Sequence, residues 1–493
     1  MCVAFFAGAN WLIEALEDQG VVDTHDPDDR VLHLAERIWE RRDDAWQVTN
    51  YGAESFVRDS FPATGDGPRV FLVGGSWALG TPYDYQGRPP KPGTISSFLE
   101  AWLRRELGPT ADVVNAGAGA QNSHRVVQVA EEALTHDPDA LIVATCNNEG
   151  ALPPNALRGW LEEQGGYRLL EKLLATGDEP ARTMFTAQAS AIDEVARAYE
   201  ANLEAIVTAA AEADVPVVLA TLPIHLLYEG LDEGHHAFPA EDPWYHGQLP
   251  AFAEELPAPD WLSQVEPCGA TLMLQEAHEW TLSLATAKRC QVKGHAVPMS
   301  ILASRARFHL KRETELDRQR LTTHFGECVL RGLTELRDGI DGAADTLSSC
   351  DEGVDEAIRW SGLAAARAGD VERARQLLRR SVEVHPRNRC RPSFNEIVRS
   401  VAGRHDHVVL ADLERDAERL APDGLPGNDL FFDSCHMTWR GYGAMATSLA
   451  THLGPLLDAD PKTLDPAALG REWMLPQGPI VEQIVFAYTE PEY

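Results

Sequence analysis

Residues 69–76 read RVFLVGGS, a continuous apolar run that ends in two glycines and a serine. A short apolar run bounded by glycines is typical of a strand buried inside a parallel sheet. Two similar runs follow, DVVN at 112–115 and ALIVAT at 140–145, and amphipathic helical patterns separate them. Strands that alternate with helices predict a doubly wound α/β sheet.

Two further strands are expected at VPVVLAT (215–221) and VVLAD (408–412), with a long stretch between them that lacks strand signals. The chain is therefore expected to form a flavodoxin-like three-layer α/β/α unit that a large helical insertion interrupts. The expected boundaries are 67–225 with 386–458 for the α/β unit, 226–385 for the insertion, 1–66 for an N-terminal helical segment and 459–493 for a Pro-rich surface tail.

Within the insertion, residues 357–386 carry small residues and leucines at the spacing of a tetratricopeptide helix pair. A single unit cannot form a solenoid, because each repeat needs neighbours to bury its apolar face. Two antiparallel helices packed on the core explain the pattern equally well.

The chain has a formal net charge of −33, from 76 acidic and 43 basic residues. Such a surface repels phosphate and anionic lipid, so neither nucleic acid nor a membrane is an expected partner. The 8 cysteines include no C-x-x-C pair, and free thiols in a reducing compartment are expected at this size. No apolar stretch approaches the roughly 18 residues that a membrane span needs. These features predict a soluble, cytoplasmic protein.

Ser76 follows the two glycines at the carboxyl end of the first expected strand, where open α/β sheets bind their ligands. Two glycines allow a tight turn that exposes the hydroxyl group. A serine is a weak nucleophile without a base. Taken alone, the triplet fits a plain turn or an anion-binding loop better than a catalytic site.

The sequence DSCH at 433–436 supplies a candidate base. Asp433 stands three residues before His436 and can fold back to accept its Nδ1 proton, which leaves Nε2 to take a proton from a serine. Considered alone, a helix-entry aspartate beside a surface histidine explains the pair equally well.

Two small polar segments are candidates for stabilising negative charge: the turn NAGAGA at 115–120 and CNNE at 146–149. The transition state of ester cleavage needs donors aimed at its oxyanion, and an Asn amide or a backbone N–H can serve. Asparagines at strand ends can also be purely structural caps.

In order and placement, these segments resemble the SGNH (GDSL-like) hydrolase family, whose blocks run G-D-S, a glycine turn, G-x-N-D and D-x-x-H. The resemblance is closest to larger bacterial members with tetratricopeptide-like helices. It covers residues 68–150, 200–225 and 386–455, and the D-x-x-H block is its most specific part. The resemblance implies a serine esterase in which Ser76 is the nucleophile, His436 is the base and then the acid, and Asp433 orients His436.

The resemblance also implies an oxyanion hole made of the Ser76 backbone N–H, the Asn148 side chain and a backbone N–H of the second block. That last donor is Ala120, which aligns with the family's glycine, or Gly119. The chain departs from the family pattern at Gly75 and Glu149, where the family carries aspartates.

Trp77, Tyr83 and Arg391 are candidate substrate contacts, because they lie near the nucleophile or where the insertion returns. A role in core packing is an equally good interpretation of Trp77, and a salt bridge that holds the insertion in place is at least as good an interpretation of Arg391. Histidines at 225, 235, 236 and 246 make a metal site conceivable, but none has helical i,i+4 spacing, and a solvated loop is the better interpretation. Neither a metal nor an organic cofactor is expected.

The function expected from the resemblance is hydrolysis of a small acyl ester on a carbohydrate or a natural product. One alternative is an acyltransferase that uses the same serine. The other is a non-catalytic binding or scaffold protein, in which the helical insertion binds a protein partner.

Overall fold

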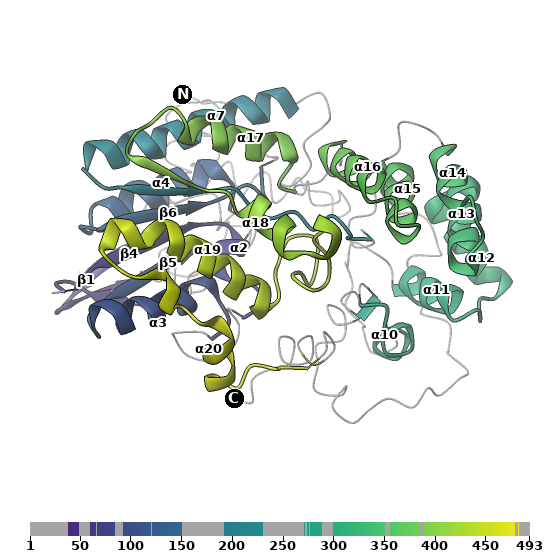
Figure 1. Cartoon of the computed structure of the whole chain (residues 1–493), viewed down its shortest axis with the longest axis horizontal. Helices are drawn as coiled ribbons and strands as arrows, with labels where there is room; N and C mark the ends of the chain where they lie inside the picture. Colours follow the sequence, from purple (N-terminus) through teal and green to yellow (C-terminus); the bar gives the residue numbers. More distant parts are fainter. Residues whose placement is uncertain are drawn as a thin grey trace, which may run out of the picture.

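The computed structural model describes residues 38–48, 60–65, 67–83, 92–119, 121–149, 192–229, 271, 274–275, 277–287, 299–350, 355–384, 389–478 and 482. These residues form a mixed α/β unit and a group of helices beside it (Figure 1).

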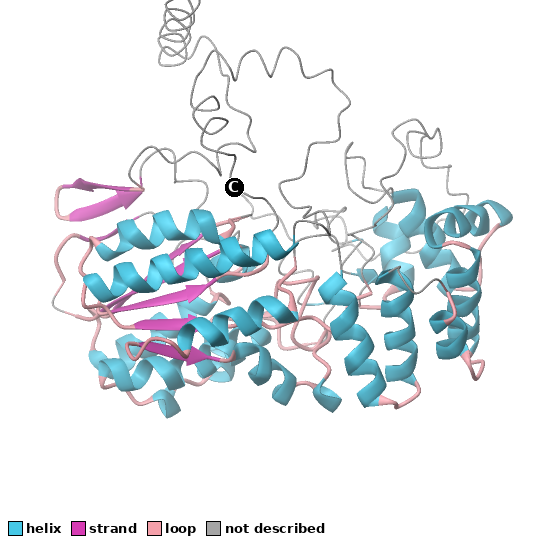
Figure 2. Ribbon diagram, turned by 90° about the horizontal axis from the view of Figure 1, so that it is seen from above, coloured by secondary structure: helices cyan, strands magenta, loops and turns pink. Residues whose placement is uncertain are grey.

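The centre of the α/β unit is a parallel sheet of five strands (Figures 1 and 2). In spatial order they are β5 (Asp112–Gly117), β4 (Arg69–Gly74), β6 (Ala140–Ala144), β7 (Val217–Ala220) and β8 (Val408–Ala411). All five strands were expected from their apolar runs. In chain order the arrangement is 2-1-3-4-5, the order of flavodoxin-like doubly wound sheets, in which ligands bind at the carboxyl ends of the first and third strands.

Helices cover both faces of this sheet (Figure 1). On one face lie α4 (Ser123–Leu134), α7 (Ile192–Glu212) and α17 (Pro392–Ala402), which pack on one another. On the other lie α3 (Ile95–Leu107) and α19 (Trp439–Leu457), with α2 (Ser76–Leu79) and α18 (Leu413–Leu420) beside them. The Thr94 side chain accepts a hydrogen bond from the Ser97 backbone N–H, which confirms the N-cap expected for α3.

The expected helical structure of residues 1–66 is wrong for the part that the structure describes. This part forms an antiparallel sheet of β1 (Trp39–Arg42), β2 (Ala45–Val48) and β3 (Ser60–Pro62). The Trp39 ring contacts the rings of Phe61, Phe71 and His136 edge-on at 5.4–5.7 Å. Docking of these aromatic rings on the main core outweighs local helix preference, because burial of such rings dominates packing energy.

The described part of the insertion is helical, as expected, and its helices follow one another as a packed series (Figure 1). They are α10 (Trp280–Ala287), α11 (Met299–His309), α12 (Glu315–Phe325), α13 (Glu327–Asp338), α14 (Ala343–Ser348), α15 (Asp355–Arg367) and α16 (Val371–Val384). The tetratricopeptide-like pair corresponds to α15 and α16, which approach closely at Gly362, where an added Cβ would lie 2.8 Å from Leu378 Cγ. Since α14 also packs on α15, the pair has a neighbour on its other side.

The expectation of free thiols is wrong for four cysteines. Disulfides join Cys146 to Cys390, 244 residues apart, and Cys328 to Cys350, 22 residues apart. Neither pairing follows a local motif, because the fold brings the partners together. Among the described residues Cys435 is not in a disulfide. The thiol argument for a reducing compartment is therefore lost.

Within the part of the chain that the structure describes, no helix is long and apolar enough to cross a bilayer. The described part of the C-terminal segment, residues 459–478, packs against α19 of the α/β unit. After α19 come the short helices η6 (Pro461–Thr463) and α20 (Pro466–Glu472), and a further short helix, η5 (Pro422–Gly424), precedes α19. The Trp473 ring lies 5.0 Å from that of Phe98 on α3.

Candidate active site

Ser76, His436 and Asp433 form one chain of hydrogen bonds. Ser76 Oγ lies 2.7 Å from His436 Nε2, and His436 Nδ1 lies 2.6 Å from Asp433 Oδ2. The carboxylate accepts the Nδ1 proton, so Nε2 is the nitrogen that accepts the Ser76 proton. This is the arrangement that the two motifs predicted.

The two glycines before Ser76 are required by close packing. An added Cβ at Gly74 would lie 2.0 Å from the Ala144 carbonyl oxygen of β6. An added Cβ at Gly75 would lie 2.8 Å from Asn148 Nδ2. The absence of a side chain at position 75 therefore lets the Asn148 amide approach the backbone next to Ser76.

Residues 433–436 form a tight turn that presents His436. Asp433 Oδ1 accepts hydrogen bonds from the backbone N–H groups of Cys435 at 2.8 Å and His436 at 2.6 Å. The Phe432 N–H donates to the His436 carbonyl at 2.8 Å, and Thr438 then caps α19. One carboxylate oxygen thus holds the turn while the other orients the imidazole.

The Asp433 carboxylate makes the His436 imidazole more basic than a free histidine. Burial by itself lowers the pKa of His436, but the Asp433 carboxylate and the neighbouring Cys435 outweigh it, and the pKa lies well above its usual value. Burial likewise raises the pKa of Asp433, but the charge and hydrogen bonds of His436 bring it below its usual value. Asp433 is therefore an anion over the range in which His436 titrates.

Asn148 and Glu149 follow β6 and form hydrogen bonds with the segment that leads into α4. One N–H of the Asn148 amide donates to the Gln121 carbonyl at 2.9 Å, beside Gly75. Glu149 accepts hydrogen bonds from the Ser123 N–H and Oγ, each at 2.7 Å. Burial raises the pKa of Glu149 to about 7, against the opposing effect of these hydrogen bonds. The Asn148 amide has a second N–H, which suits an oxyanion donor.

The turn at residues 115–120 is described only as far as Gly119. Gly119 is exposed, and a Cβ added there would meet nothing within 4 Å. Ala120 lies outside the described residues. Its role as a backbone donor stays a prediction.

The structure corrects the roles expected of the substrate-contact candidates. Trp77 is buried and packs against the Tyr442 ring at 5.9 Å, which favours core packing. Tyr83 is fully buried, and its Oη accepts the Trp439 backbone N–H at 2.9 Å. Arg391 is buried and donates to the Glu383 carbonyl oxygen. Trp77 and Tyr83 were chosen because they follow Ser76 in the sequence, but neighbours of a site residue can also point into the core.

His225 is the residue near the triad that sequence reasoning misplaced in a solvated loop. Its side chain is fully buried, and its Nδ1 lies 2.6 Å from the Asp433 carbonyl oxygen. The two residues are 208 positions apart, so no local pattern links them. The other histidines of that group, 235, 236 and 246, lie outside the described residues.

One group of described side chains has the composition of a metal site. Ligand atoms of Asp433, Cys435 and His436 lie within 4.8 Å of one another. Two of these residues already form the hydrogen-bonded chain to Ser76, so a cation there would compete with that chain.

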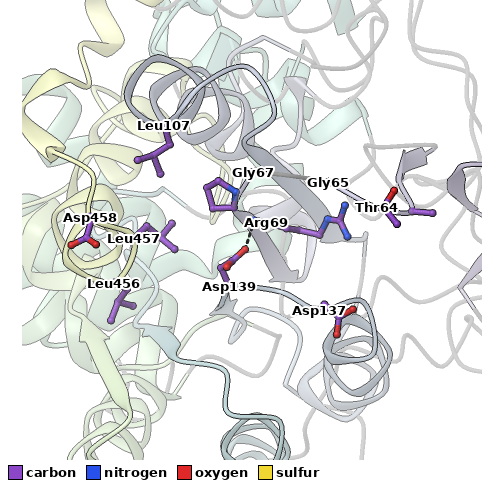
Figure 3. Close-up of a pocket in the computed structure, with 12 residues that line it drawn as sticks. Thr64, Gly65, Gly67, Arg69, Leu107, Asp137, Asp139, Leu456, Leu457 and Asp458 are labelled. Atoms are coloured by element: carbon purple, nitrogen blue, oxygen red, sulfur yellow. Dashed lines mark hydrogen bonds between the residues drawn. The ribbon is translucent and has the colours of Figure 1, made fainter.

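A cavity of about 810 Å³ lies elsewhere in the α/β unit (Figure 3). Its lining includes Arg69, Asp137, Asp139 and Asp458. Arg69 begins β4, whereas Ser76 follows the other end of the same strand. With about 3.3 Å per residue, the strand separates the cavity from the triad by roughly 20 Å. The cavity is therefore not the place where a substrate meets Ser76.

No protein-family model, no curated protein and no solved structure matches this chain.

Proposed function

We propose that the protein is a serine-dependent ester hydrolase of the SGNH type. The observation that carries this proposal is the unbroken hydrogen-bonded chain Ser76–His436–Asp433. It lies at the carboxyl ends of the strands where doubly wound sheets bind ligands. The Asn148 amide beside Gly75 supports it further.

The proposed reaction has two steps. Ser76 Oγ forms a bond to the acyl carbon while its proton moves to His436 Nε2, and His436 gives that proton to the leaving alcohol as the ester bond breaks. Water then attacks the acyl-enzyme and loses a proton to His436, which returns it to Ser76 Oγ as the acid leaves. Asp433 stabilises the imidazolium that forms in each step.

The charge that develops on the acyl oxygen needs at least two donors. The Ser76 backbone N–H and the free arm of the Asn148 amide are the proposed ones, together with a backbone N–H at Gly119 or Ala120. A small acyl ester of a carbohydrate or a natural product remains the proposed substrate class, by analogy with the family.

The hydrogen-bonded arrangement of Ser76, His436 and Asp433 favours an enzyme over the alternative of a non-catalytic scaffold protein. An inactive relic has no need to keep Asp433, His436 and Ser76 within hydrogen-bond distance, since mutual alignment of three polar side chains costs conformational entropy. The acyltransferase alternative uses the same serine and differs in the acceptor of the second step.

Labelling with a fluorophosphonate probe tests the proposal. We expect the folded protein to be labelled at Ser76, and the Ser76→Ala variant to be unlabelled. Ser400→Ala is the matched control, because Ser400 is an exposed serine on α17. Release of acetate from a chromogenic ester without an added acceptor would favour hydrolysis over transfer. Absence of labelling in the folded wild type would refute the catalytic proposal.

A further inference from the structure

His225 is held firmly behind the catalytic turn. Its ring stacks on that of Phe431, with centroids 4.9 Å apart and planes 8° apart, and it lies 5.3 Å from the Tyr228 ring. Phe431 belongs to the segment that leads into Asp433. The imidazole is therefore fixed by aromatic packing, and a short polar contact joins it to the catalytic turn.

That contact defines the protonation state of His225. A carbonyl oxygen only accepts, so Nδ1 carries the proton and donates it to Asp433 O at 2.6 Å. Burial lowers the pKa of His225 to about 3, although the hydrogen bond to Asp433 opposes this. The ring is neutral over the range in which the proposed reaction operates, and it remains a donor of unchanged charge.

Arg389 joins the second end of the insertion to the same turn. Its Nη2 lies 3.4 Å from both the His225 carbonyl and the Ser434 carbonyl. Its guanidinium lies 4.8 Å from the Tyr228 ring centroid. The next residue, Cys390, is bonded to Cys146 of the third block. The two ends of the insertion therefore meet at the backbone of the catalytic turn.

We infer that His225 is a positioning residue for the proposed reaction, because it fixes the main chain of Asp433 and thereby the direction in which His436 faces Ser76. The inference rests on the proposed function. His225 contacts no reacting atom, so its effect is exerted through Asp433. His225 is the last residue of the α/β unit before the insertion, so the alignment of the triad depends on the point at which the insertion begins.

The test compares two replacements that remove different parts of the side chain. His225→Phe keeps a flat ring for stacking and loses the donor. His225→Asn loses the ring but places an amide nitrogen near the position of Nδ1. The matched control is His407→Phe, since His407 Nε2 also contacts a backbone carbonyl, that of Val207, at 3.1 Å, in a region without triad residues.

We expect His225→Phe to slow fluorophosphonate labelling of Ser76 by about tenfold. The variant leaves the Asp433 carbonyl without its donor, and the energy of one such lost hydrogen bond corresponds to about that change in rate. The pH midpoint of labelling should fall, because Asp433 supports the His436 cation less well. His225→Asn should recover part of the rate, and His407→Phe should label at the wild-type rate. A purely structural role predicts instead that thermal stability falls while the pH midpoint stays unchanged, and that result would overturn the inference.

A measurement on the wild-type protein complements these variants and does not depend on their folding. In ¹⁵N NMR spectra, His225 should be a neutral Nδ1–H tautomer with a slowly exchanging proton from pH 5 to 9. A Nε2–H tautomer would contradict the inference. If the wild type fails to label while this tautomer is present, the proposed function fails and the hydrogen bond from His225 to Asp433 stands.

Discussion

His436 Nε2 lies 2.7 Å from Ser76 Oγ, although 360 residues separate the two in the chain. Ser76 follows β4 near the beginning of the α/β unit, and His436 precedes α19 near its end. Because parallel strands share their carboxyl ends at one edge of the sheet, both residues reach the same place. Removing or displacing either partner therefore tests the proposed chemistry directly.

Replacement of His436 by alanine should abolish most turnover while the protein stays folded. Without a base, Ser76 keeps its proton, and we expect ester hydrolysis to fall by about 10³–10⁶-fold. Steady-state rates with a chromogenic acetyl ester measure the loss, and circular dichroism checks the fold. A variant that kept a tenth of the wild-type rate would exclude His436 as the base.

The rate should rise with pH, with a midpoint above 6.5. Only neutral His436 accepts a proton, and Asp433 holds the pKa of His436 well above its usual value in spite of burial. The imidazole therefore becomes competent only as the pH passes that raised pKa. The profile of kcat/KM against pH reports this midpoint.

Asp433→Asn should move that midpoint to lower pH and reduce the plateau rate by about 10³–10⁴-fold, because the carboxylate that stabilises the imidazolium is gone. The same pH profile, recorded on the variant, checks both effects. A midpoint that does not move would show that Asp433 and His436 are not coupled in solution.

Gly75→Ala should impair the site more than its small size suggests. The added Cβ would lie 2.8 Å from Asn148 Nδ2, so the amide must shift away from the nucleophile. We expect labelling of Ser76 to slow by at least about tenfold, the smaller end of losses seen when an oxyanion donor is displaced. Gly65→Ala is the control, since its Cβ would have only an ordinary 3.5 Å contact with Arg69. Equal labelling rates would argue against Asn148 as a donor.

Reduction of the Cys146–Cys390 disulfide should destabilise the α/β unit and slow labelling. The bond spans 244 residues, and the chain-entropy relation gives about 5 kcal/mol of stability for a loop of that size. The Cys390 N–H also donates to the Asn147 side chain at 3.1 Å, next to Asn148. Thermal unfolding and labelling of Cys390→Ser measure both effects.

Cys350→Ser is the matched control for this experiment, because the Cys328–Cys350 bond lies in the insertion and spans 22 residues. It should lower stability less and leave labelling unchanged. If Cys146 and Cys390 both react with an alkylating reagent in the native protein, the bond is absent and the prediction fails.

Between about pH 4.5 and 7, the free energy of unfolding of Glu149→Gln should rise relative to that of the wild type as the pH increases. Burial raises the folded-state pKa of Glu149 to about 7, against its usual value of 4.5. Between these values the folded state binds more protons than the unfolded state, so wild-type stability falls with pH. The loss is about 3 kcal/mol at most. The glutamine does not titrate, and unfolding curves of both proteins at several pH values should diverge in this window. Parallel curves would contradict the raised pKa.

Much of the α/β unit was predictable from local patterns. The runs at 69–74 and 140–145 became β4 and β6, because a short, continuous apolar run suits a strand covered on both faces. Asp433 and His436 were also predictable as a pair, since their separation of three positions lets one turn join them.

Other parts were not predictable, for physical reasons that differ from case to case. The strands at 39–62 depend on rings from Phe71 and His136, which a local window does not contain. Trp77 and Tyr83 looked like substrate contacts because they follow Ser76, but the direction of a side chain depends on what packs around it.

The sequence by itself determined the strands of the sheet, the helical character of the insertion, and the residue types that make up a serine, a base and its partner. Only the tertiary structure decided that Ser76 meets His436, that Cys146 pairs with Cys390, and that His225 holds Asp433. Periodicity and turn chemistry act over a few residues. Contacts across hundreds of residues depend instead on which apolar faces pack together, and that is a property of the whole chain.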